Sequence, residues 1–167
     1  MKLIGKGAFT KCYLNDDSKT VTLHSVDNIK ECMAYGWFPS SYLFPNVNPT
    51  EEQGVYTMKY YKRVSSLKNS LSPRQWDLYK VLREVMAKFD YMTHVNALFT
   101  AWHEAFDTIP SKYAREREVI KEALDACANY GQDINFEISP RNIAVQGNKL
   151  VLLDCFFLTR QLKAVRS

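Results

Sequence analysis

The stretch Glu137-Ile-Ser-Pro-Arg-Asn142, together with the aspartate at position 154, decides how the rest of the chain is interpreted. Between them, two apolar runs at 143–145 and 150–153 flank the turn residues Gln146-Gly-Asn148. Glycine and asparagine readily adopt the positive φ of a tight turn, so this segment is predicted to be a β-hairpin. Because the open ends of a hairpin lie together, Asn142 and Asp154 are expected to be close in space.

The side chains at these two positions have the chemistry of a hard-cation site. Mg²⁺ prefers carboxylate and amide oxygens, usually shared with phosphates and water, so Asn142 and Asp154 are candidate metal ligands. Glu137 lies five residues before Asn142, on the incoming loop, where its carboxylate could face a substrate hydroxyl as a general base. Taken alone, each acid is an ordinary surface residue, and only the joint spacing favours a functional site.

A glycine-rich stretch, Gly5-Lys-Gly-Ala-Phe9, stands at the other end of the chain. Its two glycines allow the backbone to approach a polyphosphate, whose oxygens the loop amides can face. Phe9 supplies an apolar tip of the kind that a lid over phosphates needs. A glycine pair on its own usually marks only a turn, so its value comes from its order relative to Asn142 and Asp154.

The remaining periodicity predicts an α+β chain with its strands first. Alternating residues predict strands at 2–4, 11–14, 19–25 and 55–62, and Asp27 is the predicted cap of a short helix over 28–35. Ser72-Pro73 is typical of a helix start, and the apolar stripes that follow predict three helices, at 78–89, 95–106 and 120–127. A boundary near 65–72 therefore separates a β-rich region from a helical one.

The composition excludes several classes of protein. The net charge of +4, from 22 basic and 18 acidic residues, is too mild to favour specific nucleic-acid binding. The four cysteines show no CxxC spacing, which argues against a zinc site and favours reduced thiols in a cytoplasmic protein. No apolar run approaches the roughly 20 residues of a membrane span, so no membrane partner is expected.

Together these segments resemble reduced eukaryotic-type protein kinases, and most closely the compact Ser/Thr protein kinases of T7-type bacteriophages. The resemblance rests on Gly5–Phe9, Val21–His24, Glu137–Asn142 and Leu152–Asp154, in that order. It implies a reduced two-lobed fold, with residues 1–64 as a small antiparallel β lobe, residues 65–167 as a helical lobe, and a cleft between them. The activation segment and the C-terminal helical platform of full-length kinases are expected to be missing, because the sequence ends thirteen residues beyond Asp154.

The resemblance also implies ATP and Mg²⁺ as cofactors and assigns roles to individual residues. Glu137 stands where the family has its catalytic aspartate, and Asn142 and Asp154 would hold the metal ions. His24 occupies the position of the ATP-contacting lysine, and Glu31 is the candidate for the glutamate that pairs with that lysine. The residues that would cover the ATP phosphates are Gly5, Lys6, Gly7 and Phe9.

Departures from the family pattern leave two kinds of activity open. A neutral imidazole at His24 lacks the charge of a lysine, and Glu137 is one methylene longer than aspartate. The resemblance implies a protein that acts on host proteins in the cytoplasm of an infected bacterium, either by Ser/Thr phosphorylation or as a pseudokinase inhibitor. The alternative is a non-catalytic protein-binding module of α+β fold.

Overall fold

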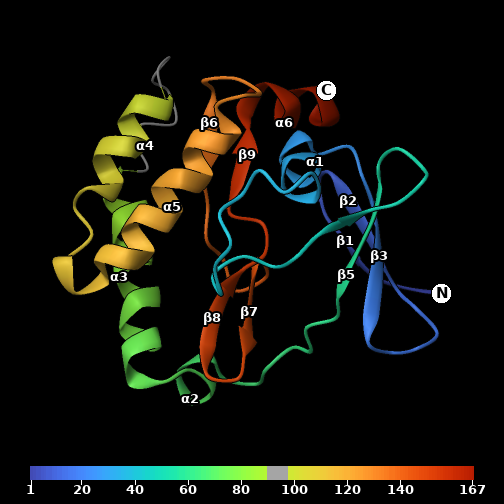
Figure 1. The fold of residues 1–167 in the computed structure, drawn as a ribbon, viewed down its shortest axis with the longest axis horizontal. Helices are drawn as coiled ribbons and strands as arrows, with labels where there is room; N and C mark the ends of the chain where they lie inside the picture. Colours follow the sequence, from blue (N-terminus) through green and yellow to red (C-terminus); the bar gives the residue numbers. More distant parts are fainter. Residues whose placement is uncertain (90–97) are drawn as a thin grey trace.

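The computed structural model describes residues 1–89 and 98–167 and confirms the α+β class. A five-stranded antiparallel sheet lies at one end of the molecule, and the long helices lie at the other (Figure 1). Two short two-stranded ladders lie between them. No helix in the described part of the chain is both long and apolar enough to cross a membrane.

The large sheet lies within the first 59 residues and contains the predicted strands, together with the short strand β4 (Asn48–Pro49), which was not predicted. In β3, Val21, Leu23 and Ser25 are buried, whereas His24 between them is exposed. One face of the sheet therefore packs into the core, and the other faces solvent. The strands run in the order β1 (Lys2–Lys6), β2 (Thr10–Leu14), β3 (Thr20–Ser25), β5 (Val55–Lys59) and β4 (Asn48–Pro49).

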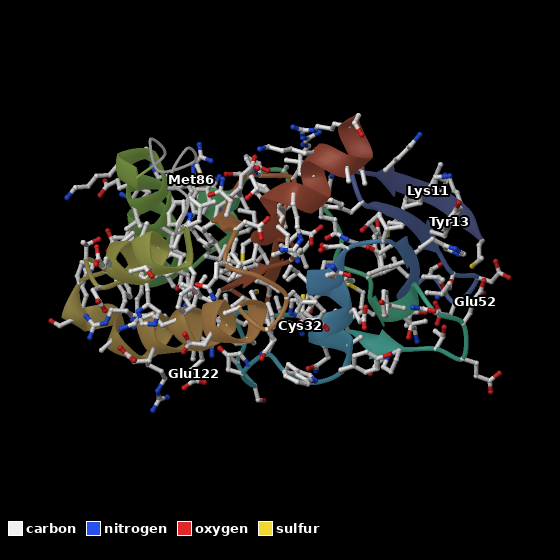
Figure 2. All side chains as sticks on the ribbon, turned by 90° about the horizontal axis from the view of Figure 1, so that it is seen from above. Lys11, Tyr13, Cys32, Glu52, Met86 and Glu122 are labelled. Atoms are coloured by element: carbon white, nitrogen blue, oxygen red, sulfur yellow. The ribbon has the colours of Figure 1, made fainter. Side chains whose placement is uncertain are left out.

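Helix α1 (Asn28–Ala34) connects the sheet to the rest of the molecule. Its predicted cap is confirmed, because the Asp27 carboxylate accepts a hydrogen bond from the Ile29 amide at 2.9 Å. Ile29 and Met33 are buried in the core. Cys32 lies where α1 meets α5 (Ala114–Cys127) in the view of Figure 2. The helix thus contacts the sheet through β4 and the helical region through α5.

The three predicted helices are present and bury the predicted stripes, as at Leu82, Trp102 and Leu124. Val95 and the side chain of Phe89, which belong to the predicted stripes, lie outside the described residues. The helices of this region are α2 (Leu67–Ser70), α3 (Pro73–Phe89), α4 (Leu98–Phe106), α5 and, at the end of the sequence, α6 (Thr159–Arg166). The short helices α2 and α6 and the 3-10 helix η2 (Ser111–Tyr113) were not predicted.

The predicted hairpin is also present, as β7 (Ile143–Gln146) and β8 (Lys149–Leu152), with Gly147 at φ 64° in its turn. A second ladder, which the sequence did not reveal, pairs β6 (Ile134–Phe136) with β9 (Phe156–Leu158). Its rings at Phe136 and Phe156 pack with Phe106 of α4. These two ladders fix both ends of the stretch that carries the candidate residues.

Candidate functional site

The two short ladders bring Glu137, Asn142 and Asp154 into one backbone network. The Glu137 amide, just after β6, donates to the Cys155 carbonyl at 2.8 Å. The Leu153 amide, just after β8, donates to the Asn142 carbonyl at 2.9 Å. Glu137 and Asn142 form these hydrogen bonds themselves, and Asp154 lies between the bonded residues Leu153 and Cys155. The predicted closeness of Asn142 and Asp154 therefore holds for the backbone.

Side chains of α3 contact the backbone of the loop that carries Glu137. Arg83 donates from its guanidinium to the Ile138 carbonyl, and the Ile138 amide lies 3.2 Å from the Met86 sulfur. The Glu137 side chain itself is exposed. Among the described residues, Ser139 in this loop carries the one buried side-chain polar atom without a hydrogen-bond partner. The loop backbone is thus held by hydrogen bonds, while the Glu137 side chain faces solvent.

The β7–β8 hairpin is anchored through groups that are themselves buried. The Leu152 amide donates to the Leu43 carbonyl at 2.6 Å. The buried amide of Gln75, on α3, accepts from the Leu150 amide at 3.0 Å and donates to the Tyr42 hydroxyl at 2.9 Å. These hydrogen bonds tie the strand that leads to Asp154 to α3 and to the Leu43 backbone, and they satisfy its buried polar groups.

Lys30, which is not among the predicted site residues, lies against Asp154. The Lys30 ammonium, on α1, is 3.2 Å from Asp154 Oδ1 and 3.3 Å from the Leu153 carbonyl oxygen. Its side chain is only 4% exposed, whereas that of Asp154 is 41% exposed. This buried ion pair ties α1 directly to the end of the β7–β8 hairpin.

Two carboxylates act on the same ammonium. Burial by itself disfavours the charged lysine, but Asp154 and Asp27 outweigh that effect and raise the pKa of Lys30. Asp27 is 3% exposed, and burial, with a contribution from the Asp154 charge, raises its pKa to about 6. The Lys30 ammonium is thus the charged centre of the group, with Asp154 as its direct partner.

The glycine stretch forms the tip of the β1–β2 hairpin. The Gly7 amide donates to the Thr10 carbonyl at 2.8 Å and closes the turn. The Phe9 ring is half-buried, and its carbonyl accepts from the Val26 amide at 3.1 Å. Lys6 is exposed. The loop is therefore attached to the segment between β3 and α1, one residue before Asp27.

The structure does not bring His24 or Glu31 to the Asp154 carboxylate. His24 lies on the exposed face of the sheet, where its ring meets Tyr13 edge-on at 5.2 Å. Figure 2 shows Tyr13 and its neighbour Lys11 at the end of the molecule opposite Met86. The Glu31 charge acts on Tyr56 and Tyr130 instead, since it helps to raise the pKa of both hydroxyls, which burial raises most.

The sequence contained a usable signal for Lys30. Lys30 lies three residues before Met33 and four before Ala34, on the buried stripe of α1. A lysine on such a stripe needs a buried counter-charge. Chain order instead predicts the cation in β3, at His24, and an acid in the helix, at Glu31.

The Mg²⁺ site at Asn142 and Asp154 stays a prediction, and the donor set fits it poorly. Lys30 already faces one Asp154 oxygen at 3.2 Å, so a divalent cation would lie beside a buried ammonium. In the described part of the chain, no three His, Cys, Asp or Glu side chains form a group that could hold a metal ion. A metal at this place would depend mainly on phosphates and water for its ligands.

Comparison with known proteins adds no relative: no model of a known protein family matches the chain, and no curated protein matches it either.

Proposed function

We propose that this protein is a reduced, protein-kinase-like nucleotide-binding module that acts on a partner protein by binding, in the manner of a pseudokinase. The observation that carries the proposal is the buried Lys30–Asp154 ion pair, at 3.2 Å, between α1 and the end of the β7–β8 hairpin. The pair joins the two lobes of the proposed fold, residues 1–64 and 65–167. It does so at Asp154, the residue expected to face the phosphates.

The order and pairing of the elements support a kinase-like nucleotide site. A sheet whose first hairpin carries Gly5 and Gly7 is followed by α1, by long helices and by the β7–β8 hairpin with Asn142 and Asp154 at its open end. In this proposal ATP lies with its phosphates between the glycine hairpin and Asp154. Gly5 and Gly7 give the loop backbone close access to the phosphate oxygens.

The positions of the cationic residues favour binding over phosphotransfer. His24, at the family's lysine position, is on the exposed face of the sheet. Lys30 is engaged with Asp154, the residue that would otherwise hold the metal. Transfer of a phosphoryl group needs its charge neutralised as it develops. With one lysine shared between Asp154 and the phosphates, we expect binding to be retained and transfer to be slow.

One observation favours Ser/Thr phosphorylation as a second candidate. The Glu137 carboxylate is exposed, while its backbone is bound to Cys155 at 2.8 Å, directly beside Asp154. A carboxylate on a fixed backbone next to the phosphate site is suitably placed to accept the proton of a substrate hydroxyl. For either candidate, the proposed partner is a host protein of an infected bacterium, a proposal that rests on the phage-kinase resemblance.

A nucleotide titration with matched variants tests the proposal. Isothermal titration should detect ATP binding to the wild-type protein and to Lys11→Met, whose lysine is exposed on β2, but weaker binding to Lys30→Met, which removes the cation nearest to Asp154. No ATP binding by the folded wild type would leave the non-catalytic α+β binding module as the function. Radiolabel transfer to host protein that is lost in Glu137→Gln would select the kinase over the pseudokinase.

A further inference from the structure

We infer that a cavity at the turn of the β7–β8 hairpin binds a small aromatic anion. The cavity has a volume of about 340 Å³ and lies between residues 40–46, Tyr61 and the turn end of the hairpin at Lys149. Asn142 and Asp154 are at the other, open end of the same hairpin. The inference therefore concerns a different site from the proposed nucleotide site and does not depend on ATP binding there.

The first support is the size of the cavity and the nature of its walls. Phe44 and Val151 line it and are only 7% and 2% exposed, so this part of the lining belongs to the core. Tyr42 and Tyr61 also line it, and the Tyr42 hydroxyl is held by a hydrogen bond from the Gln75 amide at 2.9 Å. Sites for small molecules span roughly 300–1,000 Å³ and have mainly apolar and aromatic walls. The cavity is thus suited to a flat ring.

The second support is the charge at the cavity. The ammonium of Lys149, a residue of the lining, lies 4.9 Å from the centroid of the Tyr42 ring, and the Lys59 ammonium lies 5.6 Å from that of the Tyr61 ring. Within residues 1–89 and 98–167, no carboxylate forms an ion pair with either lysine, and none of the described residues that line the cavity is acidic. An anion is therefore the complementary ligand.

The third support is the set of polar side chains at the rim. Ser40, Asn46 and Gln146 line the cavity and are exposed. A side-chain amide offers two donors and an acceptor, and in the described part of the chain neither amide is hydrogen-bonded to another residue. These groups can bind the polar edge of a ring while Lys149 binds its anionic group. A ring that carries a phosphate or carboxylate group thus matches the walls, the rim and the charge together.

The decisive experiment titrates phenyl phosphate, which combines a ring with an anion, into the isotope-labelled wild-type protein and follows the backbone amides by NMR. We expect saturable shifts at Tyr42, Tyr61 and Lys149, and none at Asn142 and Asp154. Inorganic phosphate and phenol, which each lack one half of the probe, should bind at least about tenfold more weakly. Equal binding of either fragment, no saturable shift at the cavity, or a response centred on Asp154 overturns the inference.

A lysine variant sharpens the result. Lys149→Met should bind phenyl phosphate roughly tenfold to a hundredfold more weakly, because it removes the charged contact to the anionic group. Lys149 is exposed, so this substitution leaves the core intact. Lys11→Met, which removes an exposed lysine from β2, outside the cavity, is the matched control and should bind like wild type. Binding to Lys149→Met with the wild-type affinity contradicts the inference.

Discussion

The two hairpins that carry the candidate residues are built alike but anchored differently. The β7–β8 hairpin is buried at Leu150 and Leu152 and is held by Gln75 and by the Leu43 carbonyl. The β1–β2 hairpin lies at the edge of its sheet, and Leu3 and Ile4 of β1 are exposed. The hairpin that leads to Asp154 is thus fixed by the core, while the glycine hairpin has room to adjust to a ligand.

The largest expected effect compares one leucine in each hairpin. Leu150 is 0% exposed and Leu3 is 50% exposed. Leu150→Ala leaves a cavity in the core and should lower the free energy of unfolding by about 3 kcal/mol. Leu3→Ala should lower it by less than about 0.5 kcal/mol. Urea denaturation of both variants measures the difference, and equal losses would show that the two hairpins are equally anchored.

The next effect concerns Asp27, on the segment that links the glycine hairpin to α1. Its pKa is raised from 3.8 to about 6, so the folded state binds a proton more tightly than the unfolded state. The contribution of Asp27 to the free energy of unfolding is therefore fully present below pH 4 and is lost as the pH rises through 6. Asp27→Asn keeps a capping oxygen and avoids this loss, so above pH 6 it should be more stable than wild type by roughly 2–3 kcal/mol.

Urea denaturation at pH 4 and pH 7.5 checks this prediction. The two proteins should be similar at the lower pH and should separate at the higher one. Asp16→Asn removes an exposed carboxylate and is the control, for which no such separation is expected. A wild type that gains stability from pH 4 to pH 7.5 relative to Asp27→Asn would contradict the stated role of burial.

A smaller effect is expected where α6 holds α1. Gln161→Ala removes the hydrogen bonds to Val26 and Asn28 and should cost about 1 kcal/mol, because water can replace both partners. Hydrogen exchange at the start of α1 should become faster. Lys163→Ala, on an exposed position of the same helix, should change neither quantity. Unchanged exchange in α1 would mean that Asp27 alone positions Lys30.

The smallest effect separates the two glycines of the hairpins. Gly147 has φ 64°, so Gly147→Ala should cost about 1 kcal/mol of stability and leave ATP binding unchanged. A methyl group at Gly5 would lie 3.7 Å from the Cys12 Cβ, an ordinary contact, so Gly5→Ala should leave stability unchanged. It should weaken ATP binding, because the added methyl keeps the backbone from the phosphates. Calorimetry on both variants tests whether Gly147→Ala lowers only the stability and Gly5→Ala weakens only ATP binding.

The fold was largely predictable because its local signals are strong. The alternation of β3, the Asp27 cap and the Ser72-Pro73 helix start each determine a nearby element. The β6 and β9 strands were missed because each has only three residues and their pairing joins segments about twenty residues apart. Short strands are defined by tertiary pairing, which periodicity along the chain does not contain.

The backbone closeness of Asn142 and Asp154 was predictable, whereas the position of Lys30 beside Asp154 was not. The hairpin between Asn142 and Asp154 follows from turn chemistry, so their closeness could be derived. Lys30 could not be paired with Asp154 from the sequence, because 124 positions separate them and only packing brings α1 onto the hairpin. The burial of Val21, Leu23 and Ser25 explains why His24 instead lies outside.

Hydrogen–deuterium exchange of the wild-type protein with and without ATP tests most directly whether one ligand joins the two hairpins. We predict that ATP slows exchange at Gly5–Phe9 and at Asn142–Asp154 together, while the amides of α5 change little. Matched protection at both hairpins would support a nucleotide between them. Protection confined to one hairpin, or found elsewhere in the molecule, would contradict the kinase-like site.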